Sequence, residues 1–303
     1  MLILKTVNPD MTAYNGFVWP GVGETIEAPD WNPSPVYGGG LHGLAWGEGD
    51  GIFMLDWEDD AVWIVFEPID AYGMPSTEEV VAINDEAVKC RRARVLCVGT
   101  KDDAIKFLFD NGAVGRAVVG AHIAVGDDQM AIVGDCGQAT AGYDGQAVAG
   151  VCGQAAAGDY GRATVSDCGQ AVVGEYGVAN TGFRGQAVAG DNGEAIADIC
   201  GIAVAGREGR ATAGTDGVAV AGYDGKAIAG DGGLAIAGDK GMAIAGAGGI
   251  AIVGQHGRAA AGVGGRIMIR HGNDYVTAVI GEALGIKADT LYWVDPAGNL
   301  QEY

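Results

Sequence analysis

A short repeat dominates this sequence. From Gly137 to Gly265 every eighth residue is glycine, and the repeating unit reads G-x-A-x-A-G-x-x. Two glycines in every unit would each cost a helix about 1 kcal/mol relative to alanine, so the repeat is not helical. Alternating A-x-A flanked by glycine is typical of a very short strand with a turn at each end. The repeat therefore predicts a mainly β chain built around a parallel β-solenoid.

The structural repeat is predicted to be sixteen residues long, twice the sequence repeat. The residue after each unit glycine alternates between two tracks. One track carries glutamine from Gln138 to Gln186 and aliphatic residues from Ile202 to Ile250, whereas the other carries mainly charged residues. One coil should therefore contain two short strands and two corners. Cysteine recurs at multiples of sixteen residues, which places it at one corner: Cys136, Cys152, Cys168 and Cys200.

The repeat also predicts which side chains face inward. In G-x-A-x-A-G the two alanines share one face of the strand and the x positions share the other. Only the alanine face is uniformly small, so we expect it to line the interior; the alternative places valine and isoleucine inside. The corner cysteines are expected to be buried and unreactive. A parallel stack of thiols lacks the convergent tetrahedral geometry of a metal site, so no metal is expected there.

The composition changes at both ends of the repeat and divides the chain into three parts. Residues 1–112 hold most of the tryptophan and proline and predict an α+β domain, with strands at 61–69 and 92–99 and a helix at 100–113 that Thr100 caps. Residues 113–272 form the octapeptide-repeat β-solenoid. Residues 273–303 predict a C-terminal cap with a hairpin around Asp295-Pro296-Ala297-Gly298, which would protect the last open edge.

This layout resembles an uncharacterised family of phage and bacterial proteins with alanine/glycine octapeptide repeats. Those proteins carry a "GFH"-like segment in a small N-terminal domain and close with "I-K-P-D-T-x-Y" and a "D-G" hairpin. The matching stretches here are "GGGLHGLAWG" (38–47) and "GIKADTLYWVDPAGNLQEY" (285–303), where Leu41 and Ala288 depart from the pattern. The resemblance implies an N-terminal α+β domain joined to a β-solenoid, and it implies no activity.

The overall charge bears on partners and location. The chain has 39 acidic and 18 basic residues, a net charge of −21, which argues against direct binding of nucleic acid. The first residues contain no apolar core of signal-peptide length, and no run of residues is long enough to cross a membrane. We therefore expect a cytoplasmic protein of a bacterial host, or a virion-associated one, that makes no membrane contact.

The sequence gives little sign of catalysis. The candidate ligand site is the glycine-rich stretch at 36–51, in which His42, Trp46, Glu48 and Asp50 could meet a bound molecule. A glycine-rich connection in which His42 packs beside Trp46 is the simpler interpretation. The acids of "DWEDD" (56–60) lack the spacing of a calcium loop and predict a solvated turn. We expect a non-enzymatic protein with no cofactor and no metal.

The leading functional hypothesis is a phage- or mobile-element-related structural protein. Its solenoid would associate with a second copy, most simply as a dimer, and display the N-terminal domain to a host protein. The self-association stripe would be an apolar row on one flat face: Ile202, Val204, Val218, Val220, Leu234, Ile236, Ile250 and Ile252.

The alternative hypothesis is an acidic anti-host inhibitor that mimics DNA or sequesters a small ligand. Mimicry ranks second because the negative charge is not distributed along the repeat. Residues 1–112 hold 19 acids against 7 bases, whereas residues 113–272 hold 15 against 10. A rod that imitates DNA should instead carry regular carboxylates along its length.

Overall fold

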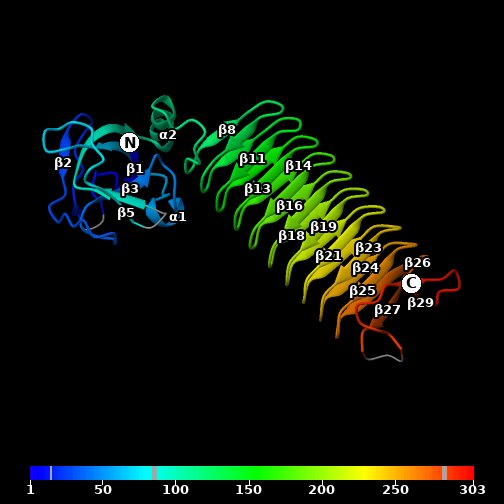
Figure 1. Cartoon of the computed structure of the whole chain (residues 1–303). Helices are drawn as coiled ribbons and strands as arrows, with labels where there is room; N and C mark the ends of the chain where they lie inside the picture. Colours follow the sequence, from blue (N-terminus) through cyan, green and yellow to red (C-terminus); the bar gives the residue numbers. More distant parts are fainter. Residues whose placement is uncertain (14–15, 84–86, 282–284) are drawn as a thin grey trace. The chain divides into compact units, whose positions relative to one another are not determined.

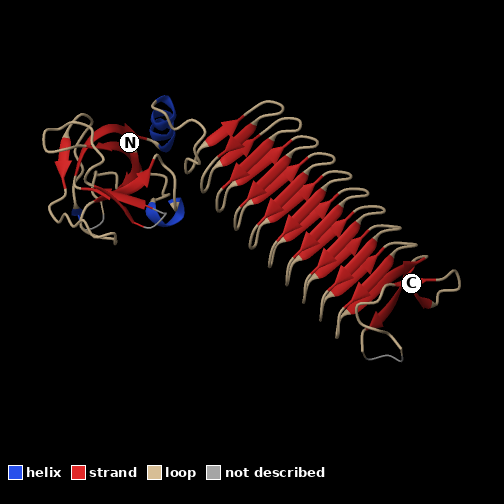
Figure 2. Cartoon of the chain, viewed as in Figure 1, coloured by secondary structure: helices blue, strands red, loops and turns tan. Residues whose placement is uncertain are grey.

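The computed structural model describes residues 1–303 except 14–15, 84–86 and 282–284. The chain divides into two compact units, one of residues 1–122 with 132–138 and the other of residues 123–131 with 139–303 (Figure 1). The helices α1 (Gly51–Met54) and α2 (Lys101–Asp110) both belong to the first unit (Figure 2). The second unit is built from short strands and turns.

The N-terminal unit contains a seven-stranded sheet in the order β2-β7-β4-β1-β3-β6-β5, in which every pairing is antiparallel. Residues from five of its strands form the hydrophobic core with Trp19 and Ala28. Two strands predicted from the sequence are confirmed, since they correspond to β4 and β7. The strands are β1 (Ile3–Val7), β2 (Thr25–Glu27), β3 (Leu41–Ala45), β4 (Val62–Pro68), β5 (Val80–Ile83), β6 (Ala87–Cys90) and β7 (Arg92–Gly99).

Helix α2 begins where the sequence indicates. The Thr100 hydroxyl accepts a hydrogen bond from the Asp103 backbone N–H, and the Asp103 carboxylate accepts one from the Thr100 N–H, which completes a capping box. The carboxylate stays ionised in this role, because its hydrogen bonds with Thr100 lower the pKa of Asp103. The buried residues Ala104, Ile105 and Leu108 fix the face that packs on β4 and β7.

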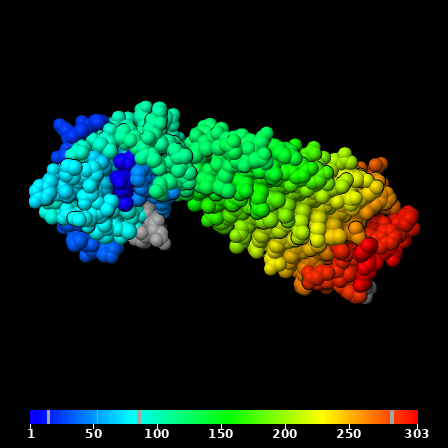
Figure 3. Space-filling model, turned by 45° about the horizontal axis from the view of Figure 1, so that its top comes forward, coloured from blue at the N-terminus to red at the C-terminus, as the bar shows by residue number. Residues whose placement is uncertain are grey.

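The solenoid consists of two eleven-stranded sheets, which confirms a mainly β chain with coils of two strands. Nine such coils follow one another along the chain. In Figure 3 the solenoid is a continuous packed stack whose colour changes gradually from green to orange. The first solenoid sheet holds β8 (His122–Ala124), β10 (Gln138–Thr140), β12 (Gln154–Ala157), β14 (Gln170–Val173), β16 (Gln186–Ala189), β18 (Ile202–Ala205), β20 (Val218–Ala221), β22 (Leu234–Ala237), β24 (Ile250–Val253), β26 (Arg266–His271) and β27 (Asp274–Val279).

The second solenoid sheet alternates with the first along the chain. Its strands are β9 (Met130–Ile132), β11 (Gln146–Ala149), β13 (Arg162–Val165), β15 (Val178–Thr181), β17 (Glu194–Ala197), β19 (Arg210–Ala213), β21 (Lys226–Ala229), β23 (Met242–Ala245), β25 (Arg258–Ala261), β28 (Tyr292–Val294) and β29 (Leu300–Glu302).

The coil repeat is sixteen residues, as predicted. Gln146 pairs with Arg162 and Gln186 pairs with Ile202, both in parallel register. Alanine lines the interior: Ala203 and Ala219 have no exposed surface, and the alternative with valine and isoleucine inside is wrong. The glycine that opens each unit is required by close packing. A Cβ added at Gly145 would lie 2.7 Å from the Ala141 Cβ.

Each corner is a four-residue turn. At the corner that contains Cys136, the Gly137 N–H donates to the Gly134 carbonyl. The third turn residue has a positive φ, 53° at Cys136 and 56° at Cys152. This left-handed conformation costs a non-glycine residue about 1–2 kcal/mol. Its backbone N–H is satisfied by the next coil, since the Cys152 N–H donates to the Asp167 carbonyl at 2.8 Å.

Two antiparallel hairpins close the C-terminal end of the stack. Strand β27 folds back on β26, and β29 folds back on β28, which itself pairs with β25. The hairpin predicted around Asp295 is present, and the Asp295 carboxylate accepts hydrogen bonds from the N–H groups of Ala297 and Asn299. Antiparallel pairing ends the parallel ladder and covers the edge of the last coil.

Candidate functional site: an uncharged solenoid face and an N-terminal pocket

The outer face of the first solenoid sheet carries no charge within the described strands β10 to β24. Each of these eight strands presents two outward side chains, and all sixteen are uncharged. The first outward row is Gln138, Gln154, Gln170, Gln186, Ile202, Val218, Leu234 and Ile250. The second is Thr140, Ala156, Val172, Val188, Val204, Val220, Ile236 and Ile252.

The outward side chains form straight rows along the sheet, because each residue pairs in parallel register with the one sixteen positions later. Neighbouring strands of a sheet lie about 4.8 Å apart, and alternate residues of one strand lie about 6.6 Å apart. The face is thus a two-row lattice of side chains. Stacking also hides part of each chain: Ile202 is 41% exposed and Ile250 37%, while Val220 and Leu234 are half-buried.

The second solenoid sheet differs from the first in charge. Its outward row includes Arg162, Glu194, Arg210, Lys226 and Arg258. Glu194 and Arg210 pair in register, and their side chains approach to 3.6 Å. The two faces of one solenoid therefore have the same backbone lattice and opposite hydration properties, since charged groups bind water strongly and aliphatic groups do not.

The cysteines lie at one corner of the coil, as predicted, but they are not buried there. Cys152, Cys168 and Cys200 are exposed and Cys136 is partly exposed, so the prediction of buried thiols is wrong. The third residue of each turn has a left-handed backbone, and its side chain lies at the surface rather than in the alanine core. Among the described residues, no group of three or more potential ligands could hold a metal ion.

The glycine-rich stretch of the N-terminal unit is fixed by two side chains. Lys89 is fully buried, and its Nζ donates to the carbonyls of Val36 and Gly38, at 2.8 Å each. The His42 Nε2 accepts a hydrogen bond from the Gly38 N–H at 3.2 Å. Partial burial, followed by the charges of Lys5 and Lys89, lowers the pKa of His42, so its ring is neutral at pH 7.

A pocket of about 710 Å³ lies beside this stretch. His42 lines it, together with Lys5 from β1, Asp30, and the aromatic side chains of Phe17, Trp19 and Tyr37. The Tyr37 and His42 rings stack with centroids 6.3 Å apart. Its volume is within the range of small-molecule sites.

The four site residues predicted from the sequence are not brought together. His42 lies at the pocket, whereas Trp46 and Glu48 hold Arg116. Glu48 Oε2 pairs with the guanidinium at 2.7 Å, and the Arg116 Cζ lies 5.0 Å from the Trp46 ring centroid. Asp50 directly precedes helix α1. Sequence reasoning missed Lys5, Phe17 and Trp19, because they reach the pocket from segments far from the glycines.

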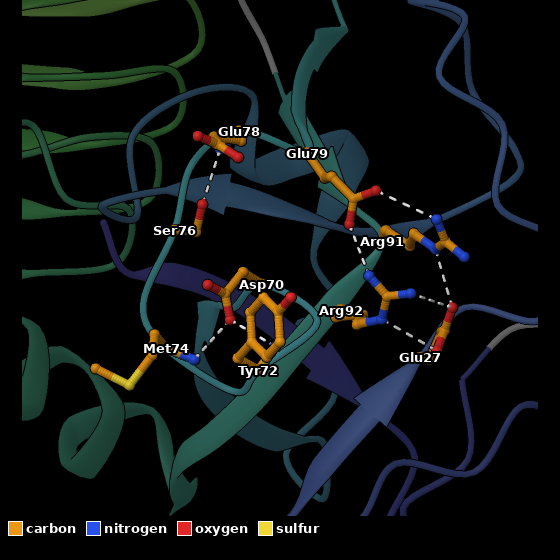
Figure 4. Close-up of polar contacts among 9 residues, drawn as sticks. All are labelled: Glu27, Asp70, Tyr72, Met74, Ser76, Glu78, Glu79, Arg91 and Arg92. Carbon is orange, nitrogen blue, oxygen red and sulfur yellow. Dashed lines mark hydrogen bonds and ion pairs between the residues drawn. The ribbon is translucent and has the colours of Figure 1, made fainter.

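Two other polar clusters have structural roles. Figure 4 shows Glu27 and Glu79 bridging Arg91 and Arg92, with the Arg92 Nη1 2.9 Å from Glu79 Oε2, which ties β2 to the start of β7. Glu27 stays ionised, because the two arginines lower its pKa. The acids of 56–60 lie in a loop that begins with a hydrogen bond from the Asp56 N–H to the Thr6 hydroxyl.

Comparison with known proteins points to one class of relative. An ice nucleation protein of Pseudomonas fluorescens is 34% identical over 111 residues, covering 37% of this chain and 8% of the relative. The ice nucleation protein InaU of Pantoea ananas is 37% identical over 114 residues, covering 37% of this chain and 10% of the relative. An ice nucleation protein of Enterobacter agglomerans is also 37% identical over 114 residues. No family model matches the chain, and no solved structure does.

These matches correct two sequence-based expectations. The chain is similar to bacterial ice nucleation proteins, so the phage-related hypothesis and the anti-host inhibitor are both wrong. The expected cytoplasmic or virion-associated location is contradicted by the same matches. No helix among the described residues has the length and apolarity needed to cross a membrane. The matched proteins are named for ice nucleation rather than for a catalysed reaction, and this chain spans between 8% and 10% of the lengths of the three relatives described.

Proposed function

We propose that this protein binds ice through the outer face of the first solenoid sheet and has no catalytic role. The observation that carries the proposal is the charge-free, in-register lattice of outward side chains from β10 to β24. The similarity to ice nucleation proteins supports ice as the ligand.

The physical basis is the order that a regular surface imposes on water. Parallel strands repeat the same outward side-chain position about every 4.8 Å, a spacing close to the repeat of oxygen atoms along hexagonal ice. Aliphatic groups do not hold water in competing hydration shells, so the first layer can adopt the arrangement that ice requires. Arginine and lysine on the opposite sheet would orient water around each charge. The uncharged face is therefore the better template.

The size of the face sets what it does to ice. A crystal nucleus forms on a surface only when the ordered patch is large enough to stabilise it. Nine coils with a rise of about 4.8 Å give a rod roughly 40 Å long. We expect one such face to bind existing ice and slow its recrystallisation, and to nucleate ice only under deep supercooling.

Ice affinity tests the proposal. The protein is placed in a solution from which a polycrystalline ice hemisphere grows slowly, and the fraction incorporated is measured. The variant Val204→Lys/Ile236→Lys places two charges on the proposed face, on β18 and β22. We expect incorporation to fall to the level of a protein that does not bind ice.

The matched control is Thr212→Lys/Ile244→Lys. It places two lysines at the equivalent outward positions of β19 and β23, also two coils apart, on the second sheet. This control should enter ice as the unmodified protein does. If both variants lose incorporation equally, or if the unmodified protein is excluded from ice, the assignment of the face is wrong.

A further inference from the structure

Lys5 occupies an unusual place in the N-terminal unit. Alternate residues of a strand point to the same face, so Ile3, Lys5 and Val7 of β1 form one row. Ile3 and Val7 belong to the hydrophobic core, where they are 0% and 3% exposed. Lys5 is therefore a cation in the middle of a core-facing row, where it is only partly buried, unlike Ile3 and Val7. Its burial lowers the pKa of the Lys5 ammonium.

The charge of Lys5 is not compensated within the described residues. The nine ion pairs among the described residues all involve other basic groups, and the Lys5 Nζ donates no hydrogen bond to a described residue. Removing a charge from water is costly unless an opposite charge or a set of acceptors replaces the water. Fully buried Lys89, by contrast, has two carbonyl acceptors.

The surroundings of Lys5 form a prepared cavity. Lys5 is one of the residues that line the 710 Å³ pocket, whose walls include the rings of Phe17, Trp19 and Tyr37. Trp19 is held in place by Phe66, with ring centroids 4.9 Å apart. The glycine-rich wall is fixed by Lys89 and His42. Contacts within the protein therefore position two walls of the pocket.

We propose that this pocket binds a small aromatic monocarboxylate, with Lys5 pairing with the carboxylate and the aromatic side chains packing against the ring. A carboxylate supplies an acceptor that no described residue gives the Lys5 Nζ, through a charge-assisted hydrogen bond. Asp30 also lines the pocket and would repel a second negative charge, which disfavours phosphate dianions. The aromatic walls favour a flat apolar body over an aliphatic one. This site is independent of the solenoid face.

Isothermal titration calorimetry with 2-naphthoate tests the proposal on the full chain. The neutral isostere 2-naphthamide has the same rings and lacks the charge. We expect naphthoate to bind at least about tenfold more tightly than the amide. Naphthoate should also raise the melting temperature of the N-terminal unit, because a ligand that binds only the folded state stabilises it. Equal affinities for the acid and the amide would overturn the role of Lys5.

Two variants and one competitor sharpen the test. Lys5→Met keeps the length of the stem and removes the charge, so the preference for the acid should vanish. Lys106→Met, on an exposed residue of α2 outside the pocket, should keep the preference. Inorganic phosphate should not displace naphthoate at equal concentration. Displacement by phosphate, or an unchanged preference in Lys5→Met, would overturn the proposal, and the comparison of acid with amide needs no variant to fold.

Discussion

Ala203 and Ala205 face the same interior from strand β18, yet their positions tolerate different side chains. Ala203 is 0% exposed and Ala205 is 4% exposed. The position of Ala203 is alanine in every solenoid strand from β10 to β25. The position of Ala205 is filled elsewhere by larger residues, Val165, Val173 and Val253 among them. In the first interior row only a methyl group fits between the two sheets. The second row, nearer the corner, has space for a side chain as large as valine.

A matched pair of substitutions follows from this difference. Ala203→Val should destabilise the solenoid by about 1–3 kcal/mol, because overpacked cores force side chains and backbone to shift. Ala205→Val should change stability by less than about 1 kcal/mol, since valine also suits a strand. Urea denaturation of the two variants measures the difference. Equal losses of stability would mean that the two rows are equally tight.

Thr181 offers a stabilising change. It occupies the second interior row, is 7% exposed, and its hydroxyl has no hydrogen-bond partner among the described residues. A buried unsatisfied hydroxyl costs about 1–3 kcal/mol, so the isosteric change Thr181→Val should raise the melting temperature. Thr164→Val is the control, because Thr164 is exposed on the outer row and should respond little. A lower melting temperature for Thr181→Val would show that the hydroxyl is satisfied in solution.

The cysteines should separate into two reactivity classes. Cys152, Cys168 and Cys200 are exposed, so iodoacetamide should label them in the native protein. Cys90 is 1% exposed, and burial raises the pKa of its thiol to about 12, so it carries almost no thiolate and should stay unlabelled. Peptide mass spectrometry before and after denaturation resolves the four sites. Native labelling of Cys90 at the rate of the other three would contradict this assignment.

Self-association through the apolar stripe stays a prediction. The stripe shares the uncharged face proposed to bind ice, so Leu234→Lys/Ile250→Lys should convert any dimer to monomer in sedimentation velocity. Several side chains of the stripe are half-buried because they pack against the same positions of neighbouring strands. This packing reduces the apolar area that a second copy could cover. Thr212→Lys/Ile244→Lys on the other sheet should leave the oligomeric state unchanged. A dimer that survives the first double variant would place the interface elsewhere.

The solenoid could be predicted from sequence because its constraints are local and repeated. The glycine and alanine positions determine strand, turn and interior at every coil, and the sixteen-residue period follows from two alternating tracks. The corner position of the cysteines was predicted correctly, but their exposure was not, because burial at a turn depends on backbone handedness, which the recurrence of one residue type does not reveal. The pocket could not be predicted, since Lys5, Trp19 and His42 are separated along the chain. Lys5 and His42 meet through the antiparallel pairing of β1 with β3, and Trp19 comes from the connection between β1 and β2.

His42 should make the N-terminal unit sensitive to mild acid. Burial, followed by the nearby charges of Lys5 and Lys89, lowers the pKa of His42 below its ordinary value of 6.5, although Asp30 and a hydrogen bond with the Gly40 backbone act in the opposite direction. The unfolded chain therefore binds a proton at a higher pH than the folded protein does. Stability should be full above about pH 6.5 and should decline as the pH falls through that value.

The decline has a local cause that a variant can remove. Protonation of His42 abolishes the acceptor at Nε2 that holds the Gly38 N–H, and it adds a third cation near Lys5 and Lys89. His42→Gln keeps a neutral acceptor, so its melting temperature should change less between about pH 7.5 and pH 5.5 than that of the unmodified protein. His256→Gln alters an exposed solenoid corner and should keep the full pH dependence. Equal slopes in all three proteins would show that another group titrates, because only His42 among these variants lies in the pocket wall.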